Sequence, residues 1–257
     1  MPDLFCFKVG DRLTMVETSV LNYTAAKNAE GKISVVVVCG GSSSRMNGID
    51  KMFAEISGMP VCVRSISAFQ KCDEIDNIVV VTREENVLKM QQLCDRFELS
   101  KVTDIVVGGS CRQQSVANGV NSLCDDTGIV LIHDGARPFV TNECIKRVVE
   151  GVKNYSAVTC AVVPKDTVKI VENDGLITST PVRDGLRAVQ TPQGFEFSLY
   201  KNAIDANKKD LENFTDDCSI VESFGYAVYT VEGDYRNIKI TTADDLLIAE
   251  IFAKEEL

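Results

Sequence analysis

The chain has 257 residues, of which 45% are hydrophobic, so it can form one large α/β domain or two small domains around a sizeable core. Its 27 lysines and arginines are outnumbered by 37 aspartates and glutamates, and the net charge of -10 argues against non-specific binding to nucleic acid or to an anionic membrane surface. A phosphate-bearing ligand must therefore be bound by locally clustered cations.

The N-terminal residues show no clear hydrophobic period, so we expect residues 1–32 to be an extension of uncertain order and residues 33–257 to be one domain. The first thirty residues lack the pattern of a secretion signal, and no apolar run is long enough to span a membrane. The ten cysteines are scattered without a CxxC spacing, and the chain has one histidine. This pattern favours reduced thiols over a metal cluster and predicts a cytoplasmic protein that contacts neither membrane nor nucleic acid.

Short β-branched runs alternate with helical patterns through the middle of the chain. The expected strands are 34–39, 77–82, 103–107, 129–133 and 157–163, and the expected helices are 61–71, 84–97, 112–123 and 142–153. The alternation predicts an α/β fold, a Rossmann-like and mostly parallel sheet with helices on both faces. Ligands of such sheets bind at the carboxyl ends of the strands, so the loops that begin at Gly40, Gly108 and Asp134 are expected to carry the site.

The pattern then changes to polar, turn-rich segments. We expect a β-arm at about residues 165–187, with a hairpin turn at 173–175, that projects from the domain. The remaining expected elements are a helix at 197–206, a helix capped by Thr215 or Asp216, strands at 227–231 and 237–240, and a final helix from Thr242.

A loop rich in glycine and serine, "CGGSSSRMNGIDK", follows the first expected strand. Gly40, Gly41 and Ser43 allow the backbone to approach phosphate groups closely, and the N–H groups and hydroxyls there can bind an anion. Arg45 can bind phosphate oxygens with two nitrogens, and Lys51 adds a mobile point charge. The loop has neither the GK[ST] ending of a Walker loop nor the third glycine of a dinucleotide fingerprint. A structural turn with solvated charges is the alternative for the loop taken alone.

A second motif, "VLIHDGARPFV", places a carboxylate at the end of a buried strand. Asp134 is suited to hold a divalent cation that bridges phosphates, and Arg137 to orient it or to bind an anionic substrate. The alternative is that Asp134 caps the following turn and pairs with Arg137. His133 points away from Asp134 along the strand, so we expect it to be structural.

A third motif, "GGSCRQQSV", combines a Gly-Gly turn with Ser110, Arg112 and Ser115 at a helix start. Its backbone donors and hydroxyls suit recognition of a nucleobase or a ribose, although a plain N-cap also explains Ser110. The second expected strand ends in Thr82 and Arg83 rather than in an acidic residue, which argues against a Rossmann dehydrogenase.

Eight motifs together resemble a known family in their order and spacing. The chain is similar to the cytidylyltransferases that make 4-diphosphocytidyl-2-C-methylerythritol from methylerythritol 4-phosphate and CTP, a class related to the ribitol 5-phosphate cytidylyltransferases. The resemblance extends from Ser34 to about Ala253. The motifs are "GGSSSRM...DK", "GGSCRQQSV", "HDGARPFV", "KDTVK", "VRDGL", "QTPQGF", "TDDCSIVE" and "GDYRNIKITTADDL".

The resemblance implies a role for each matching residue. Arg45 and Lys51 match cations that bind the triphosphate of CTP and stabilise the transition state. The cytosine and ribose site is matched by Gly109, Ser110 and Ser115, and the HDxARP element by Asp134 and Arg137. The resemblance further implies Mg²⁺ or another divalent cation, and a homodimer formed through the β-arm. The residues that match the sugar-phosphate site are Thr167, Arg183, Thr191, Thr215 and Lys239, and of these Arg183 and Lys239 are also expected to act in catalysis.

The chain departs from the family pattern at several positions. Asp50 precedes Lys51 where the family has proline, and Cys39 begins a loop that usually starts with alanine. Gly135 stands where alanine is common and Arg187 where tryptophan is common. The short "RMNGIDK" also resembles the loop of molybdopterin guanylyltransferases, whereas the HDxARP and QTPQ elements favour the cytidylyltransferase. Transfer of CMP to ribitol 5-phosphate and a non-catalytic nucleotide-binding module remain the alternatives.

Overall fold

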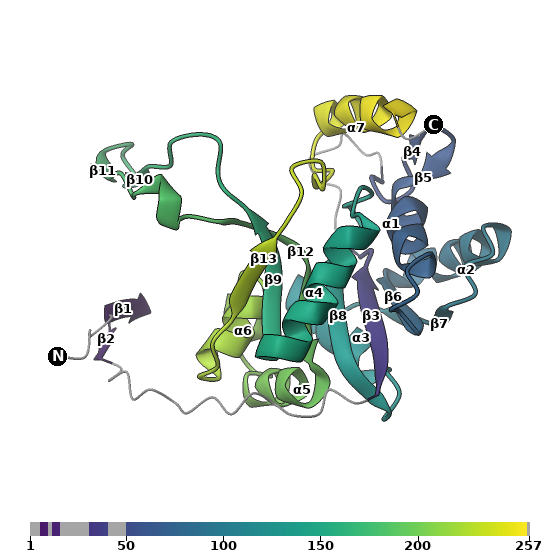
Figure 1. The fold of residues 1–257 in the computed structure, drawn as a ribbon, viewed down its shortest axis with the longest axis horizontal. Helices are drawn as coiled ribbons and strands as arrows, with labels where there is room; N and C mark the ends of the chain where they lie inside the picture. Colours follow the sequence, from purple (N-terminus) through teal and green to yellow (C-terminus); the bar gives the residue numbers. More distant parts are fainter. Residues whose placement is uncertain (1–5, 10–11, 16–30, 41–49, 256–257) are drawn as a thin grey trace.

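The computed structural model describes residues 6–9, 12–15, 31–40 and 50–255. A seven-stranded sheet, in the order β13-β9-β12-β8-β3-β6-β7, forms the centre of the fold (Figure 1). Six strands run in one direction, and β12 lies antiparallel between β8 and β9. The expected α/β fold with a mostly parallel sheet is confirmed. The strands are β3 (Lys32–Val38), β6 (Asn77–Thr82), β7 (Val102–Val107), β8 (Thr127–Asp134), β9 (Ala157–Val162), β12 (Ala188–Glu196) and β13 (Tyr229–Glu232).

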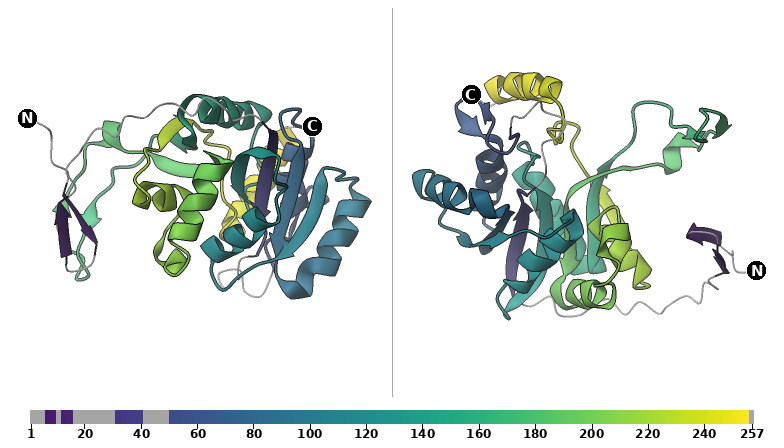
Figure 2. Two further views of the ribbon diagram at one scale, coloured as in Figure 1. Left: turned by 90° about the horizontal axis from the view of Figure 1, so that it is seen from below. Right: turned by 180° about the vertical axis from the view of Figure 1, so that it is seen from behind.

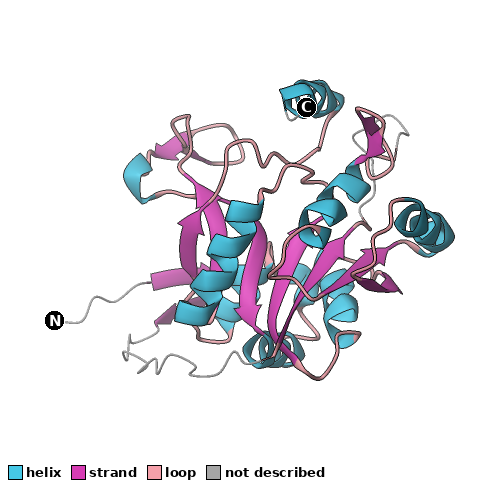
Figure 3. Ribbon diagram, turned by 45° about the vertical axis from the view of Figure 1, so that its right-hand side comes forward, coloured by secondary structure: helices cyan, strands magenta, loops and turns pink. Residues whose placement is uncertain are grey.

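Helices cover both faces of the sheet (Figure 3). Alternate residues of a strand point to opposite faces, so Val35 and Val37 of β3 enter one core while Val36 and Val38 enter the other. The first core contains side chains from α1, α2 and α4, and the second contains side chains from α3, α5 and α6. The helices are α1 (Val61–Gln70), α2 (Val87–Arg96), α3 (Arg112–Asn121), α4 (Asn142–Tyr155), α5 (Phe197–Ala206), α6 (Asp217–Ser223) and α7 (Ala243–Glu255).

Most expected elements are confirmed to within a few residues, and Asp216 caps α6 through the amide of Ser219. The expected helix at 84–97 is a short 3-10 turn, Glu84–Asn86, followed by α2. The expected strand at 227–231 begins slightly later, as β13.

The expected strand at 237–240 is wrong. This segment crosses the carboxyl edge of the sheet, because the Ile240 amide donates to Ala136 O and the Asn237 carbonyl accepts from Arg137. Its apolar residues enter a small cluster with α7 rather than a strand ladder.

The segment after β9 extends away from the body of the molecule (Figures 1 and 2). It contains β10 (Ile170–Val171) and β11 (Ile177–Ser179), an antiparallel pair whose turn includes Gly175 at φ +89°. Residues 165–180 are exposed throughout. We call residues 165–187 the arm.

Two further hairpins accompany the main sheet. β1 (Cys6–Val9) pairs with β2 (Arg12–Met15) near the N-terminus. β4 (Glu55–Ile56) pairs with β5 (Met59–Pro60) beside α7 (Figure 1). Among the described residues, none of the helices has the length and apolar character needed to cross a bilayer.

Candidate active site

A pocket of about 250 Å³ lies at the carboxyl ends of β3 and β8, next to the start of α3. Segments far apart in the sequence meet there, as expected for a parallel sheet whose strand ends share one edge. Six of the lining residues are site residues predicted from the sequence: Gly40, Lys51, Gly109, Ser110, Asp134 and Lys239. The other lining residues are Val38, Met52, Cys111, Arg112 and Ala136.

Asp134 is the electrostatic centre of this pocket. Its Oδ1 accepts from Arg112 Nε at 3.0 Å, and its Oδ2 lies 2.8 Å from Lys239 Nζ and 3.7 Å from Arg137 Nε. Burial by itself would raise the pKa of Asp134, but Arg112, Lys239 and Arg137 outweigh burial and hold the pKa well below its usual range. The carboxylate therefore stays ionised and lies beside three cations, of which Arg112 and Lys239 line the pocket.

Arg112 is a pocket residue that the sequence did not single out as a site residue. It bridges two acidic side chains, since its Nη1 lies 2.8 Å from Asp217 Oδ2 while its Nε contacts Asp134. Asp217 is fully buried and also accepts from Tyr200 Oη at 2.7 Å. Although burial would lower the pKa of Arg112, Asp217 and Asp134 raise it above its usual value. Arg112 thus ties the end of β8 to the start of α6.

The loop before α3 is held in shape by Ser115. Its hydroxyl accepts from the Gly109 amide at 3.0 Å and donates to the Cys111 carbonyl at 2.9 Å. The N-cap of α3 is Cys111, whose Sγ accepts from Gln114 N, so the alternative of Ser110 as the N-cap is wrong. Ser110 instead donates to the side chain of Gln114. Ser115 shapes the loop, and Gly109 and Ser110 face the pocket.

A chain of hydrogen bonds runs beneath Asp134. The Asp134 amide donates to Thr191 Oγ1 at 3.1 Å, and Thr191 Oγ1 lies 3.0 Å from His133 Nδ1. His133 Nε2 lies 3.2 Å from Arg137 O, so the imidazole fits this chain as a neutral donor at Nε2. Burial lowers the pKa of His133 to about 4, which agrees with the expected structural role. Thr191 is buried and supports the position of Asp134.

Other predicted residues lie outside this pocket. Thr167 and Arg183 are exposed residues of the arm, and Arg183 Nη1 donates to Lys165 O. Thr215 is exposed and directly precedes the cap of α6. Arg137 is close to Asp134 but gives its Nη1 to the Asn237 carbonyl at 2.7 Å. Three predicted residues of the glycine-serine loop lie outside the described residues, namely Gly41, Ser43 and Arg45.

Gly135 and Cys39, two of the residues at which the chain departs from the family pattern, lie next to each other. A Cβ added at Gly135 would overlap with Cys39 Sγ and would lie 3.1 Å from Val38 O. The larger side chain at position 39 therefore occupies the space that alanine would need at position 135. The thiol is buried, and burial raises the pKa of Cys39 well above its usual value.

The pocket fits a magnesium ion only in combination with a phosphate ligand. Asp134 is the acidic residue among its described lining residues, and both of its oxygens already contact cations. In the described part of the chain, no group of three or more histidine, cysteine or acidic residues is arranged to hold a metal. Magnesium is commonly held by one or two carboxylates together with substrate phosphates, which matches one carboxylate surrounded by phosphate-binding cations.

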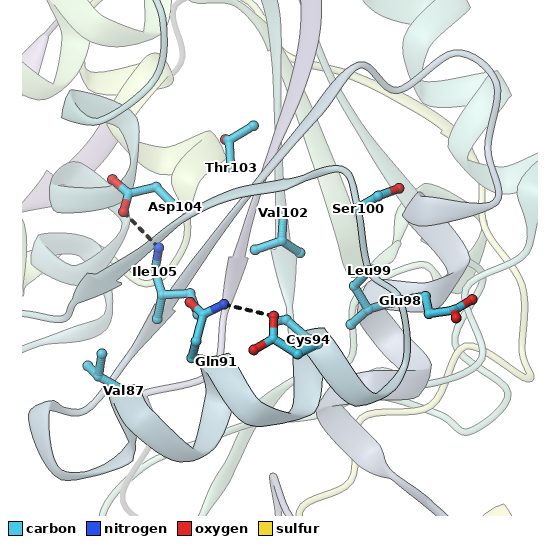
Figure 4. Close-up of a pocket in the computed structure, with 11 residues that line it drawn as sticks. Val87, Gln91, Cys94, Glu98, Leu99, Ser100, Val102, Thr103, Asp104 and Ile105 are labelled. Carbon is cyan, nitrogen blue, oxygen red and sulfur yellow. Dashed lines mark hydrogen bonds between the residues drawn. The ribbon is translucent and has the colours of Figure 1, made fainter.

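Two other hollows are less suited to a triphosphate. One, of about 600 Å³, lies between α2 and β7 (Figure 4), and its walls carry the carboxylates of Asp95, Glu98 and Asp104. There Gln91 donates to Asp95, and burial raises the pKa of Cys94 to about 11. The other, of about 650 Å³, lies at the ends of β9 and β13, and its lining includes the acidic residues Glu232 and Asp234 as well as Arg147 and Arg187.

A mostly parallel sheet with a cation-lined pocket at its carboxyl edge defines an α/β protein suited to bind an anionic ligand such as a nucleotide. The comparisons with known proteins identify the particular family. A sequence model described as "2-C-methyl-D-erythritol 4-phosphate cytidylyltransferase" matches residues 33–255. The chain belongs to this family.

The similarity extends over most of the chain and of its relatives. The enzyme of this name from Clostridium botulinum (strain ATCC 19397 / Type A) is 41% identical over 220 residues, which is 85% of this chain and 96% of the relative. The one from Clostridium perfringens (strain SM101 / Type A) is 41% identical over 226 residues, 87% of this chain and 100% of the relative. The crystal structure of 4-diphosphocytidyl-2C-methyl-D-erythritol synthase from Anaerococcus prevotii DSM 20548 has a TM-score of 0.78 at 28% identity, and covers 88% of this chain and 97% of its own.

Proposed function

We propose that the protein transfers CMP from CTP to 2-C-methyl-D-erythritol 4-phosphate and releases pyrophosphate. Membership of the family supports the reaction. The observation that carries the proposal for the site is the pocket at the start of α3 that is lined by Lys51, Arg112 and Lys239, with Arg112 and Lys239 paired with Asp134. A dense group of cations with one ionised carboxylate suits a polyphosphate substrate.

The reaction needs no general base in this pocket. The attacking group is a phosphate oxygen of the acceptor, which is already ionised at neutral pH. The chain's one histidine is buried below the pocket, and burial lowers its pKa to about 4, so it takes no proton from the substrate. Catalysis therefore consists of alignment for in-line attack on the α-phosphate and of neutralisation of its charge.

The two substrates occupy different parts of the pocket. The triphosphate binds on the side of Gly40 and Lys51, and the nucleoside lies against Gly109 and Ser110, where the first amides of α3 favour an electron-rich group. The acceptor phosphate lies near Lys239. Arg45 is assigned to the triphosphate by the family resemblance alone.

A divalent cation completes the charge balance when CTP is bound. Mg²⁺ would be held by the phosphates and Asp134, and would supply neutralisation of the triphosphate charge. Without the nucleotide, three cationic side chains around one carboxylate disfavour a free metal ion.

The arm supports a homodimer. Thr167 and Arg183 are assigned to the acceptor, yet both are exposed on the arm rather than on the pocket wall of their own chain. A second subunit whose arm reaches this pocket brings them to the substrate. The arm exposes apolar side chains, which suits an interface: Val168, Ile170, Val171, Leu176, Ile177 and Val182.

Pyrophosphate release with CTP and Mg²⁺ tests the proposed reaction. We expect pyrophosphate release when 2-C-methyl-D-erythritol 4-phosphate is the acceptor. We expect no release when ribitol 5-phosphate is the acceptor, or when GTP or ATP replaces CTP. Release with ribitol 5-phosphate alone would keep the chemistry and overturn the acceptor. Absence of release with both acceptors, from protein that binds CTP, would favour a non-catalytic nucleotide-binding module.

A further inference from the structure

Asp50 is the residue directly before Lys51, and its carboxylate is held by three groups. Oδ1 accepts from the Met52 amide at 3.1 Å. Oδ2 pairs with Arg83 Nη2 and accepts from Asn86 Nδ2 at 3.4 Å. The Asp50 carbonyl also accepts from the amides of Phe53 and Ala54. Asp50 thus starts the turn that carries Lys51 and joins it to the segment after β6.

The same strand end also holds the other side of the glycine-serine loop. The Cys39 amide donates to the Val81 carbonyl of β6 at 2.6 Å, and Arg83, two residues after Val81, directly follows β6. The residues on both sides of the loop are therefore hydrogen-bonded to one short segment: Cys39 to the backbone of Val81, and Asp50 to the side chains of Arg83 and Asn86. This arrangement fixes the distance across the loop and the direction in which the chain continues toward Lys51.

An isolated surface ion pair contributes little to stability, typically about 0–1 kcal/mol. The Asp50–Arg83 pair differs from such a pair because one carboxylate combines the ion pair with two further hydrogen bonds from neighbouring segments. The side chains of Asp50 and Arg83 are 25% and 38% exposed, so the pair is partly shielded from water. The Asp50–Arg83 pair is therefore expected to affect the geometry of the Lys51 turn more than the stability of the whole protein.

The position is also one at which this chain departs from its family pattern, since proline is the residue expected before the lysine. Proline fixes φ near −65° through its ring and needs no partner. Asp50 lacks that restraint and instead has side-chain contacts to Arg83, Asn86 and Met52.

We propose that Asp50 and Arg83 are positioning residues that hold Lys51 toward the phosphates of the nucleotide, in place of the rigid backbone that proline would provide. The inference rests on the proposed function, because it requires Lys51 to act on the bound triphosphate. Arg83 touches Asp50 rather than the substrate, so it acts through the turn.

Steady-state kinetics with CTP and the acceptor test this inference. Arg83→Ala and Asp50→Ala are each expected to lower kcat about tenfold or more while KM for CTP changes much less, because displacement of a transition-state group by about 1 Å can cost up to 100-fold in rate. The double variant is expected to lose no more than either single variant. Glu85→Ala is the matched control, because it removes the other partner of Arg83, at 3.1 Å, and leaves Asp50 paired.

A rescue experiment separates positioning from folding. In an Asp50→Pro background, Arg83→Ala is expected to have no further effect on kcat, since the ring replaces the ion pair. Asp50→Asn, which keeps an acceptor for the Met52 amide but loses the charge, covers the case in which Asp50→Ala fails to fold. The inference would be overturned if Asp50→Asn and Arg83→Ala were both fully active. It would also be overturned if Arg83→Ala lowered kcat as much in the Asp50→Pro background as in the wild-type protein.

Lys51→Ala distinguishes the inference from the proposed function. If Lys51→Ala retains full kcat, the assigned role of Lys51 is wrong and the inference is overturned with it. If Lys51→Ala is inactive while Arg83→Ala is fully active, only the positioning inference is overturned. Arg83→Ala is expected to add no loss to Lys51→Ala.

Discussion

At the scale of single residues, the site is organised by Arg112, which shares its guanidinium between Asp134 and Asp217. The pairing with Asp217 could not be predicted from the sequence, because Asp217 lies 105 positions from Arg112 and resembles an ordinary residue of the first turn of a helix. The planar guanidinium reaches two carboxylates at 3.0 and 2.8 Å, a geometry that a lysine ammonium cannot reproduce.

We therefore expect Arg112→Lys to lower kcat/KM, and Arg112→Met to lower both activity and the free energy of unfolding. The stability loss is expected to be about 3–5 kcal/mol, because Asp217 would be left buried with a charge and no cation. Adding Asp217→Asn to Arg112→Met removes that charge, and is expected to recover stability without recovering activity. Denaturant unfolding and pyrophosphate release measure the two effects, and a recovery of both would assign Arg112 a purely structural role. Lys153→Ala, which breaks the exposed pair with Glu74, is the control.

The contact between Cys39 and Gly135 gives a second prediction at this scale. Gly135→Ala is expected to destabilise the protein by about 1–3 kcal/mol, because the new methyl group overlaps with the Cys39 thiol. Cys39→Ala removes the thiol, and the double variant is expected to be more stable than Gly135→Ala. Thermal unfolding of the wild-type protein, the two single variants and the double variant measures the coupling between the positions. Strictly additive changes in stability would show that the two positions do not compete for space.

His133 gives a prediction on pH dependence. Its pKa is lowered to about 4 by burial, whereas an unfolded histidine titrates near 6.5, so the unfolded state binds more protons between these values. Stability from this group is complete above pH 6.5 and decreases as the pH falls toward 4, by about 2 kcal/mol between pH 7 and pH 5. Because the chain has one histidine, His133→Gln is expected to flatten this dependence in urea unfolding at the two pH values. If the pH dependence of the free energy of unfolding were the same in His133→Gln, other titratable groups would be its cause.

At the scale of elements, a small cluster under α7 supports three site segments. Ile56 follows the Lys51 turn, Phe139 follows Arg137 and Ile240 follows Lys239, and all three pack with Ala249 and Ala253 of α7. Glu250 of α7 also accepts from the amide and the hydroxyl of Ser57 in the β4–β5 turn. The helix therefore connects segments that come from distant parts of the sequence.

Ile240→Ala tests this connection. The side chain is fully buried, so the substitution is expected to cost about 2–4 kcal/mol in the free energy of unfolding and to lower kcat, since Lys239 is its neighbour. Leu247→Ala on the outer face of α7 is the control, because this side chain is 67% exposed and is expected to change neither quantity measurably. Loss of stability with unchanged kcat would separate the cluster from the site.

Hydrophobic periodicity predicted most strands and helices because their apolar residues alternate with the period of the element. β12 was missed for a physical reason: its sequence contains Pro192 and the buried polar residues Gln190, Thr191 and Gln193. Gln193 bonds to the amides of Asp217 and Cys218 and to Asp216, and Gln190 bonds to Asp234. These side chains bind backbone and carboxylate groups near the site, so their polarity has a structural cause that pattern analysis cannot detect.

The part of the candidate site that lies in local sequence motifs was predictable. Glycines at strand ends, Asp134 and Lys51 are visible in local motifs, and they meet in one pocket. The position of Lys239 is different, because it depends on a segment that crosses the sheet edge instead of forming a strand. Which cations contact Asp134 depends on tertiary packing.

At the scale of the whole molecule, the proposed dimer gives the last prediction. If an arm completes the pocket of a partner subunit, then Arg183 and Lys239 act in the same site from different chains. Arg183→Ala and Lys239→Ala homodimers are then each inactive, because every site lacks one cation. In a mixed dimer, one site lacks both cations and the other lacks none. Equal mixing after reversible dissociation gives half mixed dimers, so roughly a quarter of wild-type activity is expected to return.

The measurement is pyrophosphate release from the mixture, with light scattering to verify dimers before and after exchange. A mixture of Arg183→Ala with Thr167→Ala is the matched control. Both changes lie on the arm, so every site in that mixed dimer contains an altered arm and no activity is expected to return. Return of activity requires that the arm of one subunit serves the pocket of the other. Dimers that exchange subunits without any recovery would place Arg183 and Lys239 in the same chain's site. A monomer with full activity would show that no partner's arm is needed for catalysis.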